Sequence, residues 1–103
     1  MKLKVTDAAL KWFKDDVELE SGDKVRFFVQ IYGDSAVREG YSLAFTLDKD
    51  DRKKAVEYEK DGIEFYVNET DVWFFDDHDL SVEYDEEKDE VVFNYIREKE
   101  RQA

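Results

Sequence analysis

The stretch KVRFFVQIY, residues 24–32, decides the fold class of this chain. Every second residue from Val25 onward is apolar, and such residues share one face of an extended strand: Val25, Phe27, Val29 and Ile31. Phe28 and Tyr32 fall on the opposite face and predict that it is also partly covered. A strand with this pattern needs a second layer of structure against its apolar face.

Six further segments read as short strands: residues 2–5, 41–47, 55–59, 63–67, 80–84 and 91–95. Asp61-Gly62 lies between two of them and is a strong hairpin signal, because the turn needs positive φ at both central positions. The last two segments flank the charged residues 85–89 and predict a terminal hairpin with a charged tip.

Two helices complete the pattern. Thr6 suits an N-cap, and Ala9, Trp12, Phe13 and Val17 then follow at the spacing of one apolar helix face. Asn68 can cap a short helix that carries Val72, Trp73 and Phe74. Of the three consecutive rings Trp73-Phe74-Phe75, two are expected in the core. The prediction is a mainly β (α+β) domain of about seven short strands, a mixed sandwich or distorted barrel, with one N-terminal and one short internal helix. Residues 1–96 form this single domain, and residues 97–103 are a polar C-terminal tail.

The charge is strongly acidic and uneven. The net charge is −12, and residues 69–90 contain eleven acidic residues and one base, Lys88. One end of the protein is therefore expected to carry a negative field that repels nucleic acid and anionic membranes and attracts a protein partner with a basic surface. An equally weighted alternative to partner binding is that the charge only keeps the chain soluble. The sequence does not determine the oligomeric state.

The chain has no cysteine. This excludes disulfides, thiolate nucleophiles, zinc fingers and ligation of an iron–sulfur cluster by its own sulfur atoms. No cofactor is predicted. The first residues lack the apolar run of a signal peptide, and no stretch has the length of a membrane span, so a cytoplasmic location is expected.

Asp76, Asp77, His78 and Asp79 are the most concentrated candidate for a metal site. Carboxylates and one imidazole suit Mn²⁺, Fe²⁺ or Mg²⁺. The spacing matches no strong template, and neighbouring residues of a strand point to opposite faces. An ordinary acidic turn is therefore favoured over a metal site.

Several segments, in this order, resemble the HesB-like domain of the A-type iron–sulfur carriers: Val5-Thr6-Asp7-Ala8-Ala9, Val25-Arg26-Phe27-Phe28-Val29, the loop from Gly33 to Tyr41, Lys60-Asp61-Gly62-Ile63, Val72-Trp73-Phe74-Phe75-Asp76 and Leu80-Ser81-Val82-Glu83-Tyr84. The resemblance covers residues 5 to about 95. It implies the HesB-like fold and a role connected with iron–sulfur cluster biosynthesis. It also directs attention to the loop that contains Gly33, Asp34, Ser35 and Gly40.

The departures from the family pattern concern the cluster ligands. The carriers have one cysteine in this loop and a Cys-x-Cys pair near the C-terminus, whereas Asp34 takes the loop position here and the C-terminal pair is missing. One carboxylate cannot replace three soft thiolates. Asp34 is also well suited to a simple turn, in which its side chain bonds the backbone, and this interpretation is favoured over a binding site.

The sequence thus predicts a cysteine-free branch of the family, with no catalytic residues. One His, no Cys and no phosphate-binding or nucleophile motif argue against an enzyme. The favoured function is a non-catalytic accessory or protein-interaction module that binds no cluster itself. The alternative is a divalent-metal protein that uses carboxylates and His78, and an undetected hydrolase or isomerase ranks last.

Overall fold

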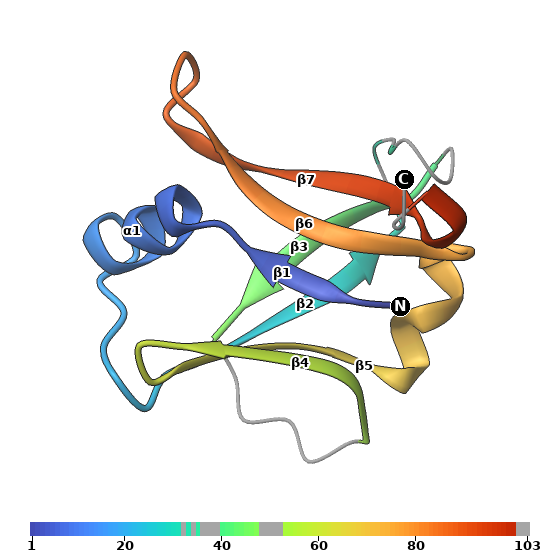
Figure 1. Ribbon diagram of the computed structural model, residues 1–103, viewed down its shortest axis with the longest axis horizontal. Coiled ribbons are helices and arrows are strands. Elements are labelled where there is room, and N and C mark those ends of the chain that lie inside the picture. The colour runs from blue at the N-terminus through green and yellow to red at the C-terminus, as the bar shows by residue number, and fades with distance from the viewer. Residues whose placement is uncertain (32, 34, 36–39, 48–52, 101–103) are drawn as a thin grey trace.

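The computed structural model describes residues 1–31, 33, 35, 40–47 and 53–100. Its elements follow in the order β1 (Leu3–Val5), α1 (Asp7–Asp15), β2 (Lys24–Gln30), β3 (Ser42–Thr46), β4 (Lys54–Lys60), β5 (Ile63–Asn68), the 3₁₀ helix η1 (Glu69–Phe75), β6 (His78–Asp85), β7 (Glu90–Arg97) and the 3₁₀ helix η2 (Glu98–Glu100). The described residues confirm the predicted mainly β fold with seven strands, a leading helix and a short internal helix (Figure 1).

The strands form two mixed sheets. One sheet has the order β1-β6-β7 and the other β3-β2-β5-β4. In each sheet one parallel pair joins strands that are distant in sequence: β1 with β6, and β2 with β5. Among the described residues no ladder of hydrogen bonds joins the two sheets, so they form an open two-layer arrangement and not a closed barrel.

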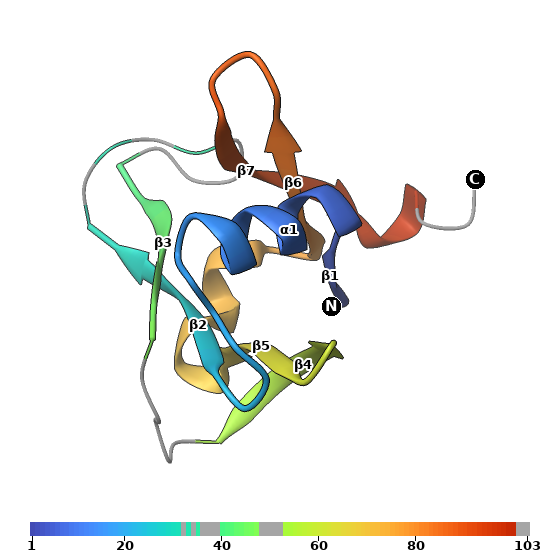
Figure 2. The same cartoon turned by 90° about the vertical axis from the view of Figure 1, so that its left-hand side faces the viewer.

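Helix α1 begins as the sequence predicts. The hydroxyl of Thr6 accepts a hydrogen bond from the backbone N–H of Ala9 at 3.2 Å, which satisfies one of the free donors at the helix N-terminus. The helix ends at Asp15, so Val17 lies beyond it, and its buried residues are Ala9, Leu10 and Phe13. Figure 2 shows α1 between β3 and the β6–β7 hairpin. Phe13 of this helix is fully buried in the core.

Aromatic rings from several elements meet in the core. Phe65 is fully buried, with its ring centroid 5.2 Å from that of Phe13 and 6.0 Å from that of Phe27. The ring centroid of Phe27 in turn lies 5.7 Å from that of Phe93 in the other sheet. Large rings fill the space between two small sheets with few residues, so this cluster holds the two layers and α1 together.

The strand predicted over residues 24–32 is present up to Gln30 and ends there. Gln30 is the last residue of β2 and pairs with Ser42 of β3. Ile31, predicted on the same apolar face as Val25 and Phe27, lies past the strand and is 80% exposed. The core assignment of Ile31 is therefore wrong, because the face of a residue follows from the strand only while the chain stays in the sheet. Tyr32 lies outside the described residues.

Asn68 occupies the predicted N-cap position of η1 but makes no capping bond with its side chain. It is fully buried, and among the described residues neither its amide nitrogen nor its amide oxygen has a hydrogen-bond partner. The predicted cap is therefore absent at this residue. As the last residue of β5, Asn68 pairs with Lys54 across the sheet, so its conformation is set by the strand.

A partly buried ion pair joins the two strands of the β4–β5 hairpin. Lys54 Nζ donates to Glu64 Oε1, and each side chain is only 23% exposed. The hydrogen bond from Lys54 holds the pKa of the Glu64 carboxyl below its ordinary value of 4.5. A carboxyl with a lowered folded-state pKa stabilises the fold above its ordinary pKa, and that contribution is lost as the pH falls through the folded-state pKa.

Glu64→Gln is accordingly expected to lower the free energy of unfolding by about 1 kcal/mol at pH 7. The difference from the unmodified chain should shrink below pH 4.5 and vanish once the carboxyl is protonated in both states. Urea unfolding at pH 7, 5 and 3 measures it. The control is Asp61→Asn, which removes an exposed pair with Lys14 and should change stability much less than Glu64→Gln does. If Glu64→Gln lowered the free energy of unfolding equally at all three pH values, the stabilising effect assigned to the Lys54–Glu64 ion pair would be contradicted.

Candidate functional site

The four residues of the predicted metal site are divided between two faces. His78 and Asp79 begin β6, and Asp76 and Asp77 form the turn before it, with φ of 45° and 64°. Asp79 is buried and accepts a hydrogen bond from the backbone N–H of Lys2 at 2.7 Å. Asp79 is thus used to hold the N-terminal segment, while the other three residues line an open hollow of about 450 Å³ on the surface.

The imidazole of His78 is held by the backbone. Its Nδ1 lies 2.8 Å from the carbonyl oxygen of Phe75 and 2.9 Å from that of Asp76. Carbonyl oxygens only accept hydrogen bonds, so Nδ1 carries the proton and donates. His78 therefore closes the turn after η1, and only Nε2 remains for another partner.

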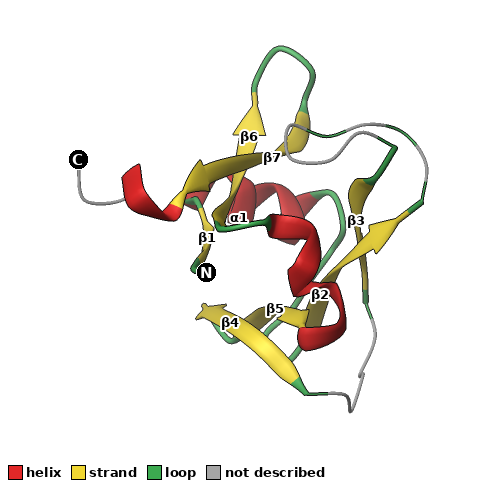
Figure 3. Cartoon of the chain, turned by 90° about the vertical axis from the view of Figure 1, so that its right-hand side faces the viewer, coloured by secondary structure: helices red, strands yellow, loops and turns green. Residues whose placement is uncertain are grey.

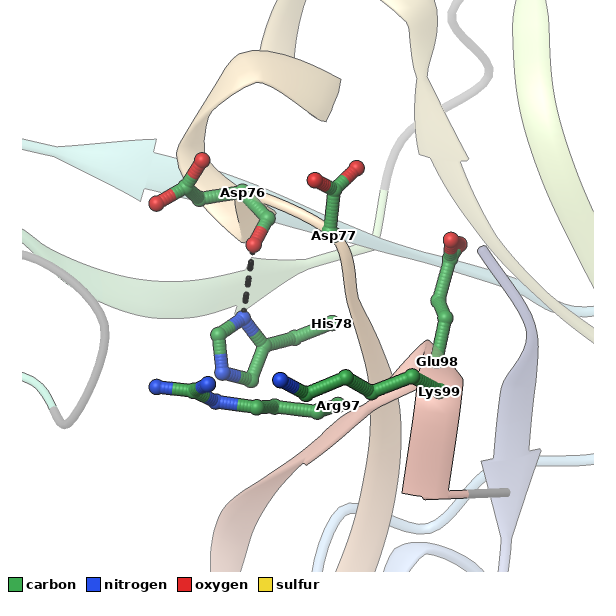
Figure 4. A pocket seen from close by; sticks show the side chains of 6 residues that line it. All are labelled: Asp76, Asp77, His78, Arg97, Glu98 and Lys99. Atoms are coloured by element: carbon green, nitrogen blue, oxygen red, sulfur yellow. Dashed lines mark hydrogen bonds between the residues drawn. The ribbon is translucent and has the colours of Figure 1, made fainter. Parts of the chain in front are cut away.

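The hollow beside His78 is also lined by two cations, Arg97 and Lys99, from the segment predicted to be a polar tail. Arg97 is the last residue of β7 and pairs with His78 across the sheet, and Lys99 follows in η2. Figure 4 shows their side chains next to the imidazole, while the carboxylates of Asp76 and Asp77 point away from it. Two cations at the ring oppose the binding of a metal ion.

Within the part of the chain that the structure describes, no group of three or more His, Asp or Glu side chains is arranged to hold a metal ion. The geometry therefore gives the predicted divalent-metal site at residues 76–79 no support, and that site stays a prediction. The alternation of neighbouring strand residues, which disfavours a metal site in the sequence, applies here because His78 and Asp79 begin β6 and point to opposite faces.

Only part of the predicted loop site can be placed. Gly33 and Gly40 have positive φ of 76° and 82°, as expected of glycines in turns. Ser35 is half-buried. Asp34, the residue that takes the cysteine position of the resemblance, lies outside the described residues, and the role of this loop stays a prediction.

The acidic segment does not form one negative end. Strand β6 runs through its middle and separates two groups of carboxylates by about 23 Å, the rise of seven residues of extended chain. One group lies at η1 and the turn after it (the acidic turn: Glu69, Asp71, Asp76 and Asp77). The other lies at the projecting end of the β6–β7 hairpin (the acidic tip: Asp85, Glu86, Glu87, Asp89 and Glu90), and Figure 1 shows the two on opposite sides of the molecule.

The ring cluster of η1 follows the sequence prediction. Phe74 and Phe75 are buried, and Trp73 is 47% exposed, with its ring centroid 5.3 Å from that of Tyr41, the residue before β3. Among the described helices, none is both long and apolar enough to cross a membrane.

The order of the strands and helices and the positive φ of the loop glycines agree with the HesB-like domain that the sequence resembles. The family model for iron-sulphur cluster biosynthesis matches residues 1–95, and the chain belongs to this family. Unlike a carrier that binds clusters through thiolates, it has no cysteine anywhere in its 103 residues.

The chain is similar to several bacterial proteins across almost its whole length. It is 46% identical over 95 residues to a protein of Bacillus subtilis named pyruvate dehydrogenase inhibitor, with 92% of this chain and 99% of that protein covered. Uncharacterised proteins of Staphylococcus saprophyticus and Staphylococcus aureus are 36% and 35% identical, over 90% and 91% of this chain and 97% and 98% of theirs.

Proposed function

We propose that this protein binds a pyruvate dehydrogenase and lowers its activity, without catalysing a reaction or carrying a cluster itself. The observation that carries this proposal is the 46% identity to the Bacillus subtilis inhibitor, which extends over 99% of that relative. Similarity at this level over a whole domain indicates the same fold and much of the same surface, and an inhibitor that acts by binding needs only a surface.

The chemistry of the chain supports a binding role. A family member without cysteine lacks the soft ligands that hold an iron–sulfur cluster. What remains is a small scaffold with a net charge of −12, and such a charge speeds association with a basic surface. We therefore propose a partner that presents basic residues at the interface.

Addition of the purified chain to a purified bacterial pyruvate dehydrogenase complex is expected to reduce the initial rate of pyruvate-dependent NAD⁺ reduction in a saturable way. Because charge steers the encounter, the concentration for half-inhibition should rise several-fold between about 50 and 300 mM salt. A 2-oxoglutarate dehydrogenase complex is the matched control for specificity. An unchanged rate at a hundredfold molar excess, together with no co-elution at low salt, would overturn the proposal.

A further inference from the structure

Two sheet edges face each other beside α1. β3 is the last strand of its sheet and β7 is the last strand of the other. A hollow of about 350 Å³ lies between them, and a second hollow of about 310 Å³ continues it along α1 to the β6–β7 hairpin. Trp12 lines both hollows, and together the two are here called the seam groove.

The middle of the seam groove is apolar. It is lined by Trp12 of α1, Leu43 and Phe45 of β3, and Val91 and Phe93 of β7. Leu43 is buried, and the other four side chains are only partly buried although they pack against the core. Such partly exposed apolar area, framed by polar residues, is typical of interaction surfaces.

The rim of the seam groove is acidic. Five carboxylates lie along it: Asp15, Asp16, Glu86, Asp89 and Glu90. Among the described residues that line the groove, Lys11 is the one base, and it forms an ion pair with Asp15. The rim therefore has a net negative charge beside an apolar centre, which fits a partner whose apolar side chains are flanked by Lys or Arg.

The backbone adds a second, independent feature. In the part of the chain that the structure describes, the outer edges of β3 and β7 pair with no strand, although β7 is eight residues long. Free edges of this kind accept an additional strand from a partner through main-chain hydrogen bonds. An added strand presents alternate side chains to opposite faces, so apolar residues would enter the groove while basic residues met the rim.

We propose that the seam groove receives an extended segment of the dehydrogenase in which apolar and basic residues alternate, and that this segment adds a strand to β7, β3 or both. The inference rests on the proposed function and assigns that function to one surface. The acidic turn at the far end of β6 then contributes only general attraction.

Two double variants with the same change in charge test the location. Glu86→Gln with Glu90→Gln removes two charges from the rim, and Asp76→Asn with Asp77→Asn removes two from the acidic turn. Glu86 and Glu90 are exposed, and asparagine tolerates the positive φ of Asp76 and Asp77. We expect the rim variant to weaken binding to the dehydrogenase complex about tenfold at low salt and the turn variant less than threefold. Equal weakening by the two variants would overturn the location.

Hydrogen–deuterium exchange of the chain with and without the dehydrogenase complex tests the strand addition. We expect slower exchange in peptides that cover β3 and β7, and unchanged exchange in β1 and β4, the other outer strands of the two sheets, which lie on another side of the molecule (Figure 3). Protection of β1, β4 or η1 in place of β3 and β7 would overturn the inference while leaving the proposed function intact.

Two further outcomes count against the seam groove as a site for the dehydrogenase. Protection of β3 and β7 that grows with the concentration of the chain alone would assign the groove to a second copy of this chain. Failure of the unmodified chain to bind or inhibit the complex would overturn the proposed function, and the inference with it.

Discussion

Phe65→Ala lowers the free energy of unfolding by an expected 4 kcal/mol or so, within the range of roughly 3–5 kcal/mol found for buried Phe truncations. Phe65 is fully buried in β5 and contacts the rings of both Phe13 and Phe27. Its removal takes away apolar area and leaves a cavity that two sheets and a helix cannot easily close. A domain of this size has a total stability of roughly 5–15 kcal/mol, so the variant should be close to unfolding.

Urea unfolding followed by circular dichroism measures this loss. Ile31→Ala is the matched control, because Ile31 is 80% exposed and its truncation should change stability by no more than about 0.5 kcal/mol. A loss below about 2 kcal/mol for Phe65→Ala would show that the core between the sheets is less tightly packed than the ring contacts indicate.

Local patterns in the sequence predict the strands well, and the reason is physical. Alternation of apolar and polar residues depends only on one half-buried face, and it does not depend on which strand lies next door. The hairpin at Asp61-Gly62 is equally local, with φ of 54° at Asp61 and 79° at Gly62 as such a turn requires. These features could therefore be recognised without the partner strands.

The pairing of distant strands has no such local signal. Leu3 of β1 lies beside Leu80 of β6, and Val25 of β2 beside Phe65 of β5, in parallel pairs that only the whole fold brings together. The open seam between β3 and β7 follows from that topology. For this reason the helix pattern predicts Trp12 on the apolar face of α1 but does not predict that it lines a groove.

The arrangement of the candidate site also has no local signal in the sequence. Residues 69–90 look like one acidic region, but an eight-residue strand divides them, since strand geometry separates its two ends by about 23 Å. The sequence also places Arg97 far from His78, whereas antiparallel pairing puts them side by side. Charge along the chain therefore predicts the sign of the field, while the fold decides where it acts.

The missing cysteines and the seam groove support one consistent interpretation. In a carrier the fold has to present thiolates, and this constraint disappears when no cysteine is present. The scaffold of two sheets and α1 can then serve recognition alone, because function lies in the residues placed on a fold and not in the fold itself. The dehydrogenase binding proposed here uses the edge of that scaffold.

Gly62→Ala tests how firmly the hairpin is tied to the rest of this scaffold. Gly62 has φ of 79°, and a Cβ added there would lie 2.1 Å from Ser21 Oγ, 2.9 Å from Ser21 Cβ and 3.2 Å from Ser21 Cα. The backbone N–H of Gly22 also donates to the carbonyl oxygen of Gly62 at 2.8 Å, so the two turns cannot separate without losing this bond. Strain and overlap together predict a loss of about 2–4 kcal/mol.

Gly22→Ala separates the two contributions to that loss. Gly22 has φ of 100°, but a Cβ there meets nothing within 4 Å, so the substitution carries only the backbone strain of about 1 kcal/mol. Thermal and urea unfolding of Gly62→Ala, Gly22→Ala, Ser21→Gly and the double variant Ser21→Gly with Gly62→Ala measure the difference. Because Ser21→Gly removes the overlapping Cβ and Oγ, we expect the double variant to recover at least about 1 kcal/mol relative to the sum of the single effects. Strict additivity would show that the turn at residues 21–22 moves aside freely and does not brace the hairpin.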